Sequence, residues 1–260
     1  MTGAALVVEG LTIRFGGLIA LDQVSVSVAP GAIHAVIGPN GAGKTTLLNL
    51  VTGIYSPTAG RVAFEGKTLT GLPPHRIAER GIARTFQNTE LFTEMSARNN
   101  VRVGLHLHLD YSLAEAVLRL PRYRHVERKA AQRAEELLDL VGLGAQADMA
   151  AGDLALGQQR RLELARALAV GPRLLMLDEP AAGLRAAEVD ELSAALRRLR
   201  DELGLTLVLI DHVMRVVMRL SDRVTVLNYG RWLAEGTPEE IRRDPAVIAA
   251  YLGGAAAHGA

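Results

Sequence analysis

Short apolar runs separated by Gly-Gly and Pro-Gly steps open the chain. They span residues 6–8, 24–28 and 33–37, and a further run, RVAFE at 61–65, continues the series. Apolar runs punctuated by turn residues are typical of short strands. The start of the chain is therefore predicted to form a small strand-rich layer.

Helical spacing takes over between residues 113 and 140. Leu113, Val117 and Leu118 recur at helical spacing among charged residues, and Pro121 interrupts the stretch. Two later runs, 174–177 and 206–210, are uninterrupted and apolar and lie beside helical stretches. Such runs are typical of parallel strands buried on both faces. Together these patterns predict an α/β core with a helical insert.

The C-terminal part carries a helix-start signal. Thr237, Pro238 and Glu240 fall at the cap, first and third positions of a predicted helix, the arrangement of a capping box. The tail GGAAAHGA, residues 253–260, offers too little apolar surface to offset the entropy of ordering it. We therefore expect the tail to fray.

Composition changes this picture mainly by what it excludes. The 260 residues are 49% hydrophobic and 22% charged, which suits one or two domains with a sizeable core. With 29 Lys+Arg against 28 Asp+Glu the formal charge is +1, so the basic excess of a dedicated nucleic-acid binder is missing, and we expect no nucleic-acid partner. The absence of cysteine excludes disulfides, thiolate nucleophiles and cysteine-bound zinc.

No targeting or membrane-spanning segment is predicted. The first residues, MTGAALVVEGLTIRF, have no basic stretch before the apolar one, which favours a strand over a signal peptide. No run of about 18 uncharged apolar residues occurs. We expect a soluble, cytosolic chain.

A phosphate-binding loop is the strongest motif. GPNGAGKT at 38–45 matches G-x-x-x-x-G-K-[ST], follows an apolar strand and precedes a helical pattern. Glycines let successive N–H groups point at phosphate oxygens, Lys44 adds a charge across the β- and γ-phosphates, and Thr45 can ligate Mg²⁺. The residues predicted to bind the nucleotide are Gly38, Pro39, Asn40, Gly41, Ala42, Gly43, Lys44, Thr45 and Thr46.

Two carboxylates follow the apolar run 174–177. A magnesium nucleotide site needs a carboxylate at the end of a neighbouring buried strand, and Asp178 is predicted to hold the metal. Because side chains alternate along a strand, Glu179 is predicted to point in another direction than Asp178. Glu179 can then act as a general base toward the attacking water.

At this point the sequence resembles the ATP-binding subunits of ABC transporters. Their five-residue signature, usually Leu-Ser-Gly-Gly-Gln, stands shortly before the strand with the paired carboxylates, and a helical pattern follows it here. The signature positions are Leu154, Ala155, Leu156, Gly157 and Gln158. At a helix N-terminus these residues would offer N–H groups to a γ-phosphate. The resemblance implies that this phosphate is bound to a second subunit.

Three more positions match the family one at a time. Phe15 lies where the family has an aromatic residue that stacks on adenine. Gln87 matches the glutamine that reaches Mg²⁺ and the attacking water, and His212 matches the histidine that contacts the γ-phosphate. The resemblance therefore implies catalytic roles for Glu179, His212 and Gln87, and metal contacts for Thr45, Gln87 and Asp178.

The resemblance covers about residues 6–252 and implies a fold and its divisions. The fold is α/β, a P-loop NTPase (RecA-like) core with a small antiparallel β layer and a helical subdomain. The implied divisions are 1–87 for the first part of the core, 88–165 for the helical subdomain ending in the signature, 166–242 for the second part of the core and 243–260 for a C-terminal segment.

The resemblance also implies cofactors and partners. ATP and Mg²⁺ would be bound, and a second ATP-binding subunit, either a copy or a paralogue, would pair with this one. Transmembrane permease subunits and, indirectly, a solute-binding protein would complete the transporter. The chain would then lie at the cytoplasmic face of the inner (plasma) membrane.

Within the family, the chain is most similar to subunits of branched-chain amino-acid importers. RTFQNTELF at 84–92, LGQQRRLE at 156–163, DEPAAGL at 178–184 and a helical insert near 105–135 carry this likeness. Importers of urea, amides and other small solutes look alike in the same segments, so they stay as alternatives.

Two departures from the family pattern bear on hydrolysis. Ala155 and Leu156 replace the usual Ser and Gly, which removes a hydroxyl donor and adds bulk, and Arg185 stands where most members have an aspartate. They suggest as an alternative a regulatory subunit with little turnover. An ABC-type ATPase of DNA repair or translation is a further alternative, but the long coiled-coil insert or second cassette expected there is missing.

Two weaker features have plainer interpretations. The basic stretch 119–125 could face lipid headgroups or nucleic acid, but a solvated helical face is the ordinary interpretation. His106 and His108 lie two residues apart without a third ligand nearby, which does not make a metal site.

Overall fold

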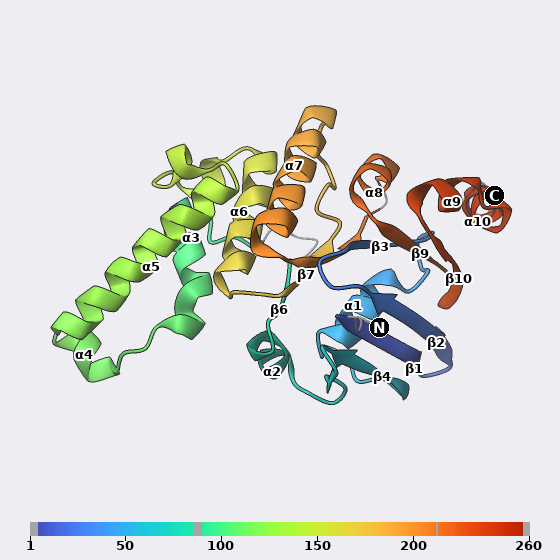
Figure 1. Cartoon of the computed structure of the whole chain (residues 1–260), viewed down its shortest axis with the longest axis horizontal. Coiled ribbons are helices and arrows are strands. Elements are labelled where there is room, and N and C mark those ends of the chain that lie inside the picture. Colours follow the sequence, from blue (N-terminus) through green and yellow to red (C-terminus); the bar gives the residue numbers. More distant parts are fainter. Residues whose placement is uncertain (1–4, 86–89, 212, 257–260) are drawn as a thin grey trace. The chain divides into compact units, whose positions relative to one another are not determined.

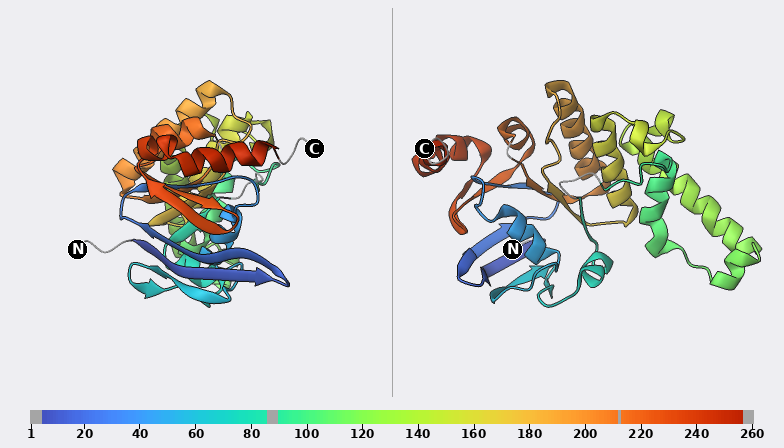
Figure 2. Two further views of the ribbon diagram at one scale, coloured as in Figure 1. Left: turned by 90° about the vertical axis from the view of Figure 1, so that its right-hand side faces the viewer. Right: turned by 180° about the vertical axis from the view of Figure 1, so that it is seen from behind.

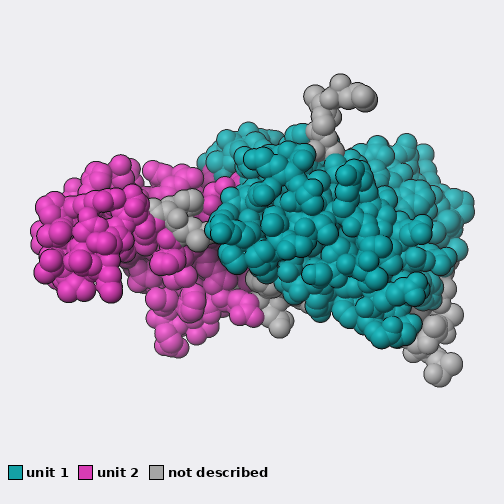
Figure 3. Space-filling view, turned by 90° about the horizontal axis from the view of Figure 1, so that it is seen from below, with its two compact units in different colours: residues 1–84, 173–182, 197–260 teal, residues 85–172, 183–196 magenta. Residues whose placement is uncertain are grey.

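The strands of the computed structural model form two sheets, which belong to the same unit (Figure 1). The structure describes residues 5–85, 90–211 and 213–256. Contacts divide the chain into a core unit (Met1–Arg84, Arg173–Ala182 and Arg197–Ala260) and a helical unit (Thr85–Pro172 and Gly183–Leu196), teal and magenta in Figure 3. The limits predicted from the sequence, after residues 87, 165 and 242, stay predictions.

A small antiparallel sheet comes from the start of the chain. In sheet order its strands are β2 (Leu18–Val28), β1 (Leu6–Phe15), β4 (Ala59–Phe64) and β5 (Lys67–Thr68). This confirms the strand-rich layer predicted from 6–8, 24–28 and 61–65. The run 33–37 was wrongly assigned to this layer, because its five residues are all buried and form a central strand of the other sheet.

The larger sheet has a mostly parallel order. Its strands are, in sequence across the sheet, β10 (Arg231–Gly236), β9 (Arg223–Asn228), β3 (Ile33–Ile37), β8 (Thr206–Ile210), β7 (Leu174–Asp178) and β6 (Ile82–Arg84). The β9–β10 pair is antiparallel, whereas the pairs β3–β9, β3–β8, β7–β8 and β6–β7 are parallel. The runs 174–177 and 206–210 are buried parallel strands, as predicted. Because parallel strands end at one edge, the segments that follow β3 and β7 start at the same edge of the sheet.

Helix α1 (Lys44–Val51) lies between the two sheets (Figure 2). Its Leu47 and Leu48 join an apolar cluster with Leu11 of β1 and Ile210 of β8. Full burial of a leucine stabilises the fold by about 1.5–3 kcal/mol. This packing fixes the start of α1, and therefore the loop that precedes it.

The remaining helices of the core unit lie after β5 or in the C-terminal half. They are α2 (Pro74–Glu79), residues 197–203 of α7 (Ala186–Leu203), α8 (Met214–Leu220), α9 (Pro238–Arg243) and α10 (Pro245–Ala256). The predicted capping box starts α9, where the Thr237 hydroxyl accepts from Glu240 N–H and the Glu240 carboxylate accepts from Thr237 N–H. Helix α10 continues four residues, 253–256, into the tail predicted to fray, because extending an existing helix adds a backbone hydrogen bond for each further residue.

The helical unit is built on a long helix. Its helices are α3 (Ala97–Gly104), α4 (Leu113–Val117), α5 (Pro121–Leu140), α6 (Leu156–Ala169) and residues 186–196 of α7. Helices α3, α5 and α6 pack on one another. Pro121 is the first residue of α5, so the predicted helical stretch is two helices. Among the helices of the described residues, none combines the length and apolar character that a membrane crossing needs.

A buried histidine in β3 makes stability depend on pH. His34 is 1% exposed, its Nε2 lies 2.8 Å from Thr225 Oγ1, and burial lowers its pKa from 6.5 to about 4, against the attraction of nearby Glu235. Between these values the unfolded chain binds more protons than the folded one, so the free energy of unfolding falls as the pH falls from 6.5 toward 4.

We expect the free energy of unfolding to decrease by about 2 kcal/mol between pH ~7 and pH ~5 through His34 alone. Guanidinium unfolding of the chain and of His34→Gln at both pH values measures this slope. The variant should lose most of it, whereas His75→Gln, a substitution of an exposed histidine, should keep it. Equal slopes in the chain and in His34→Gln would contradict the assignment.

Candidate nucleotide-binding site

The predicted phosphate loop connects β3 to α1 and is packed closely at both ends. Gly38 has φ 153°, and a Cβ there would lie 2.1 Å from the Leu227 carbonyl oxygen. Gly43 has φ 97°, and a Cβ there would lie 2.5 Å from Leu21 Cδ2. At Gly41, among the described residues other than its two chain neighbours, no atom lies within 4 Å of the Cβ position. The loop is therefore held against the core at its ends, with open space over Gly41.

The Lys44 ammonium lies inside this loop. Its Nζ donates to the carbonyl oxygens of Gly38 at 2.8 Å and Pro39 at 3.0 Å. Burial lowers the pKa of Lys44, and the nearby carboxylates of Glu179 and Asp178 oppose that shift. The predicted phosphate-binding cation and the two predicted carboxylates thus lie close enough to interact electrostatically.

The start of α1 is suited to an anion. Its first turn contains no acidic residue, and its first N–H groups have no partner within the helix. Thr45 is exposed at this end and Thr46 is half-buried. Backbone donors, the positive end of the helix dipole and an exposed hydroxyl therefore come together here, as phosphate binding requires.

Asp178 ends β7 and is 2% exposed. Its Oδ2 accepts from Arg84 Nη2 at 2.7 Å. Its Oδ1 is buried and has no hydrogen-bond partner within residues 5–85, 90–211 and 213–256. A buried carboxylate oxygen that lacks a partner is a fitting ligand for a hard cation, so the residues present are compatible with Mg²⁺.

Glu179 follows directly in an unusual backbone conformation. Its φ is 49°, in the left-handed region, and its N–H donates to the Ile210 carbonyl at 2.7 Å. Its side chain is only partly buried. Left-handed conformations of non-glycine residues cost of order 1 kcal/mol and cluster at active sites, where they aim a side chain. Here the backbone leaves the extended strand conformation at Glu179, whereas Asp178 is still the last residue of β7.

An aromatic pair lies in the small-sheet part of the core unit. Phe15, at the end of β1, is 44% exposed, and its ring meets that of Tyr55 edge to face with centroids 5.2 Å apart. An exposed ring can stack on a purine base. Tyr55 was not predicted as a site residue, and only its position shortly after the phosphate-loop helix could have suggested it.

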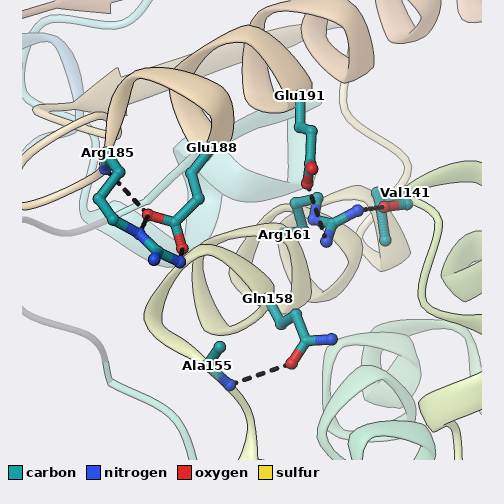
Figure 4. A network of polar contacts seen from close by, with 7 residues as sticks. All are labelled: Val141, Ala155, Gln158, Arg161, Arg185, Glu188 and Glu191. Carbon is teal, nitrogen blue, oxygen red and sulfur yellow. Dashed lines mark hydrogen bonds and ion pairs between the residues drawn. The ribbon is translucent and has the colours of Figure 1, made fainter.

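The signature residues start α6 in the helical unit (Figure 4). Ala155 caps the helix without a side-chain acceptor, while the Gln158 side chain accepts from Ala155 N–H at 3.0 Å. Gly157 is buried, and a Cβ there would lie 3.2 Å from Glu188. Leu154 is buried, whereas Leu156 is 41% exposed. The missing hydroxyl at Ala155 and the exposed bulk at Leu156 thus lie at the start of this helix.

Arg185 lies beside the same helix start (Figure 4). Its guanidinium Nε is 3.2 Å from Glu188 Oε2, and its N–H donates to the same oxygen at 2.9 Å. These bonds from Arg185 lower the pKa of Glu188. Arg161, one turn further along α6, contacts Glu191 of α7 at 3.4 Å. The Arg161–Glu191 pair therefore joins α6 to α7, whereas the Arg185–Glu188 pair lies at the start of α7.

The predicted residues fall into two groups. The phosphate loop, Asp178 and Glu179 come together in the core unit, and 154–158 belong to the helical unit. Gln87 and His212 lie outside the described residues. Arg84 was not predicted as a site residue, although it is the first residue of the segment 84–92 that contains Gln87.

Comparisons with known proteins agree with this geometry. The sequence profile described as ABC transporter matches residues 21–182, and that described as branched-chain amino acid ATP-binding cassette transporter matches 233–257. The chain is 49% identical over 253 residues to the high-affinity branched-chain amino acid transport ATP-binding protein BraF of Pseudomonas aeruginosa, covering 97% of this chain and 99% of BraF. It is 46% identical to LivG of Escherichia coli (strain K12), which has the same description, with the same coverage.

A solved structure has the same fold over almost the whole chain. The ADP conformation of MJ1267, an ATP-binding cassette of an ABC transporter, superposes with a TM-score of 0.85 at 32% sequence identity. The match covers 97% of this chain and 100% of that structure. A nucleotide is therefore bound by a protein with this fold.

Proposed function

Since this chain belongs to the ABC transporter family of ATP-binding proteins, we propose that it hydrolyses ATP to energise an importer of branched-chain or related amino acids. The single observation that supports hydrolysis best is the arrangement in the core unit. Lys44 in a phosphate loop lies near Asp178 and Glu179 at the end of a parallel strand.

The loop residues 38–46 bind the phosphates of ATP in this proposal. N–H groups at the start of α1 and the Lys44 ammonium neutralise the phosphate charge. Phe15 stacks on the adenine ring. Thr45, Asp178 and Gln87 would hold Mg²⁺, which would supply positive charge against the phosphates when bound.

Glu179 is the general base in this proposal. It accepts a proton from water, whose oxygen bonds to the γ-phosphorus while the bond from that phosphorus to the bridging oxygen of ADP breaks. His212 contacts the γ-phosphate from the segment after β8. The left-handed backbone of Glu179 supports this role, because it aims the carboxylate away from the strand.

A second chain completes the site. The signature residues 154–158 of one subunit bind the γ-phosphate held by the phosphate loop of the other, in a head-to-tail pair of copies or paralogues. The buried Gly157 at the start of α6 supports this proposal, since it brings backbone donors to a helix N-terminus. The core unit and the helical unit correspond here to the nucleotide-binding core and the signature-bearing subdomain.

Membrane subunits are the partners that would be driven when the two ATP-binding subunits close on ATP. We place the chain at the cytoplasmic face of the inner membrane through contacts with permease subunits, and a solute-binding protein delivers the solute without touching this chain. Family membership supports the transport complex, and the similarity to BraF and LivG, both described as branched-chain amino acid transport ATP-binding proteins, supports the solute class.

Uptake of labelled leucine tests the solute class. Cells that express the chain with its cognate permease and solute-binding subunits should take up leucine, and unlabelled isoleucine and valine should compete for it. Cells that carry the same subunits with Lys44→Ala in this chain are the control. Uptake of urea or an amide in place of leucine would favour the alternative importers.

A regulatory subunit with little turnover is the second candidate. Arg185, Ala155 and Leu156 favour it, because all three lie at the start of α6 and α7 where the signature would meet a phosphate. A rate of ATP hydrolysis in the assembled transporter that does not rise with transport would support this candidate over the first.

A further inference from the structure

Arg84 is a buried cation that the mechanism above does not use. It ends β6, its side chain is 7% exposed, and its Nη2 donates to Asp178 Oδ2 at 2.7 Å. Its Nη1 donates to Asn49 Oδ1 of α1 at 2.6 Å. The guanidinium is thus held between the helix of the phosphate loop and the strand that ends in Asp178.

Stability alone does not explain an arginine here. Replacing a buried ion pair with apolar residues is often neutral or stabilising, so a buried pair is weak evidence for a stabilising role. Asp178, however, has to stay if it holds a metal, and its buried charge then needs a counter-charge whenever the metal is away. Arg84 supplies that counter-charge from a position 94 residues earlier in the chain.

The two oxygens of Asp178 have different surroundings. Oδ2 is bonded to Arg84, while Oδ1 is buried without a partner within the described residues. A guanidinium keeps its charge at any physiological pH. A divalent cation on Oδ1 therefore shares one carboxylate with a fixed positive charge, and like charges in a poorly solvated site repel strongly.

We propose that Arg84 is a positioning residue that sets the metal affinity of the site: it holds Oδ2 of Asp178, leaves Oδ1 for Mg²⁺, and weakens the binding of that cation by its charge. The inference rests on the proposed function, because it takes Asp178 as the metal ligand. Its consequence is that Mg²⁺ leaves readily with the products instead of staying on Asp178.

Charge and geometry can be separated by three variants. Arg84→Met removes the charge, Arg84→Lys keeps it, and Asn49→Asp leaves Arg84 in place but neutralises it from the opposite side with a side chain of the same size. The readout is Mn²⁺ binding to the ADP-bound protein, followed by the electron paramagnetic resonance signal of free Mn²⁺. ADP binding in the presence of EDTA is measured in parallel.

We expect Arg84→Met to bind Mn²⁺ about 10-fold more tightly than the unmodified chain, as removal of a nearby like charge requires. Arg84→Lys should stay close to the unmodified chain, and Asn49→Asp should shift in the direction of Arg84→Met. If Arg84→Met does not fold, the Mn²⁺ affinities of Asn49→Asp and Arg84→Lys can be compared instead, because the charge at residue 84 is neutralised in the first and kept in the second.

Unchanged or weaker Mn²⁺ binding in Arg84→Met and Asn49→Asp would overturn the proposal, as would Arg84→Lys behaving like Arg84→Met. ADP binding distinguishes this failure from that of the proposed function. A chain that binds ADP in EDTA but shows no charge effect contradicts only the role of Arg84. A chain that does not bind ADP at all contradicts the nucleotide site itself.

Discussion

Glu179→Gln lowers the steady-state rate of ATP hydrolysis by about 10²-fold or more, the expected loss when a general base is removed. Glutamine has nearly the same size and can still accept a hydrogen bond, but it cannot take the proton of the attacking water. Binding of Mg-ATP should therefore persist. Phosphate release by the assembled transporter measures the rate, and a fluorescent ATP analogue measures the binding.

The same variant reports on pairing. An ATP molecule that is bound but not hydrolysed should hold two subunits together, so light scattering should show a shift from monomer to dimer when Mg-ATP is added. A persistent monomer with ATP bound would indicate a paralogous partner, or a signature made ineffective by Ala155 and Leu156. Glu239→Gln, at an exposed position of α9, is the matched control. If Glu179→Gln hydrolysed ATP as fast as Glu239→Gln, Glu179 would not be the general base.

Lys44→Ala should weaken ATP binding by about 10- to 100-fold, since a hydrogen bond to a charged group contributes roughly 1.5–3 kcal/mol. The side chain supplies a charge to the phosphates, and its Nζ also bonds the carbonyls of Gly38 and Pro39. The substitution therefore removes the phosphate contact and loosens the loop. Isothermal titration with ATP in EDTA measures the loss without a contribution from the metal.

Lys67→Ala is the control for this variant, because Lys67 is exposed in β5 of the small sheet. Its ATP affinity should equal that of the unmodified chain. Undiminished affinity in Lys44→Ala would contradict the assignment of the phosphate loop. A thermal melt of each variant separates loss of a contact from loss of the fold.

The phosphate loop and the Asp178-Glu179 pair could be predicted because each is contiguous. A strand, a glycine-rich turn and a helix follow one another within residues 33–51, so the local sequence contains the whole motif. The same holds for Thr237 and Glu240, whose capping box involves only neighbouring backbone groups.

Arg84 could not be predicted in this way. It ends β6, a strand of three residues, and no periodicity can be read from so short a segment. Its partner Asp178 is 94 residues away, and only the pairing of β6 with β7 brings them together. The assignment of residues 33–37 to the small sheet was wrong for a related reason. An apolar run predicts a buried strand, but not which strands will lie beside it.

The position of β3 has a consequence for the growing polypeptide during translation. Its neighbours in the sheet are β8 and β9, and the Ile33 N–H donates to Asp222, 189 residues later. Gly38 packs against the carbonyl of Leu227. Contacts so distant in sequence form late, after the intervening chain has been synthesised. A nascent chain that still has Leu227 inside the ribosome therefore lacks the contacts that hold Gly38 in place, and we expect it to bind ATP only after Leu227 has emerged.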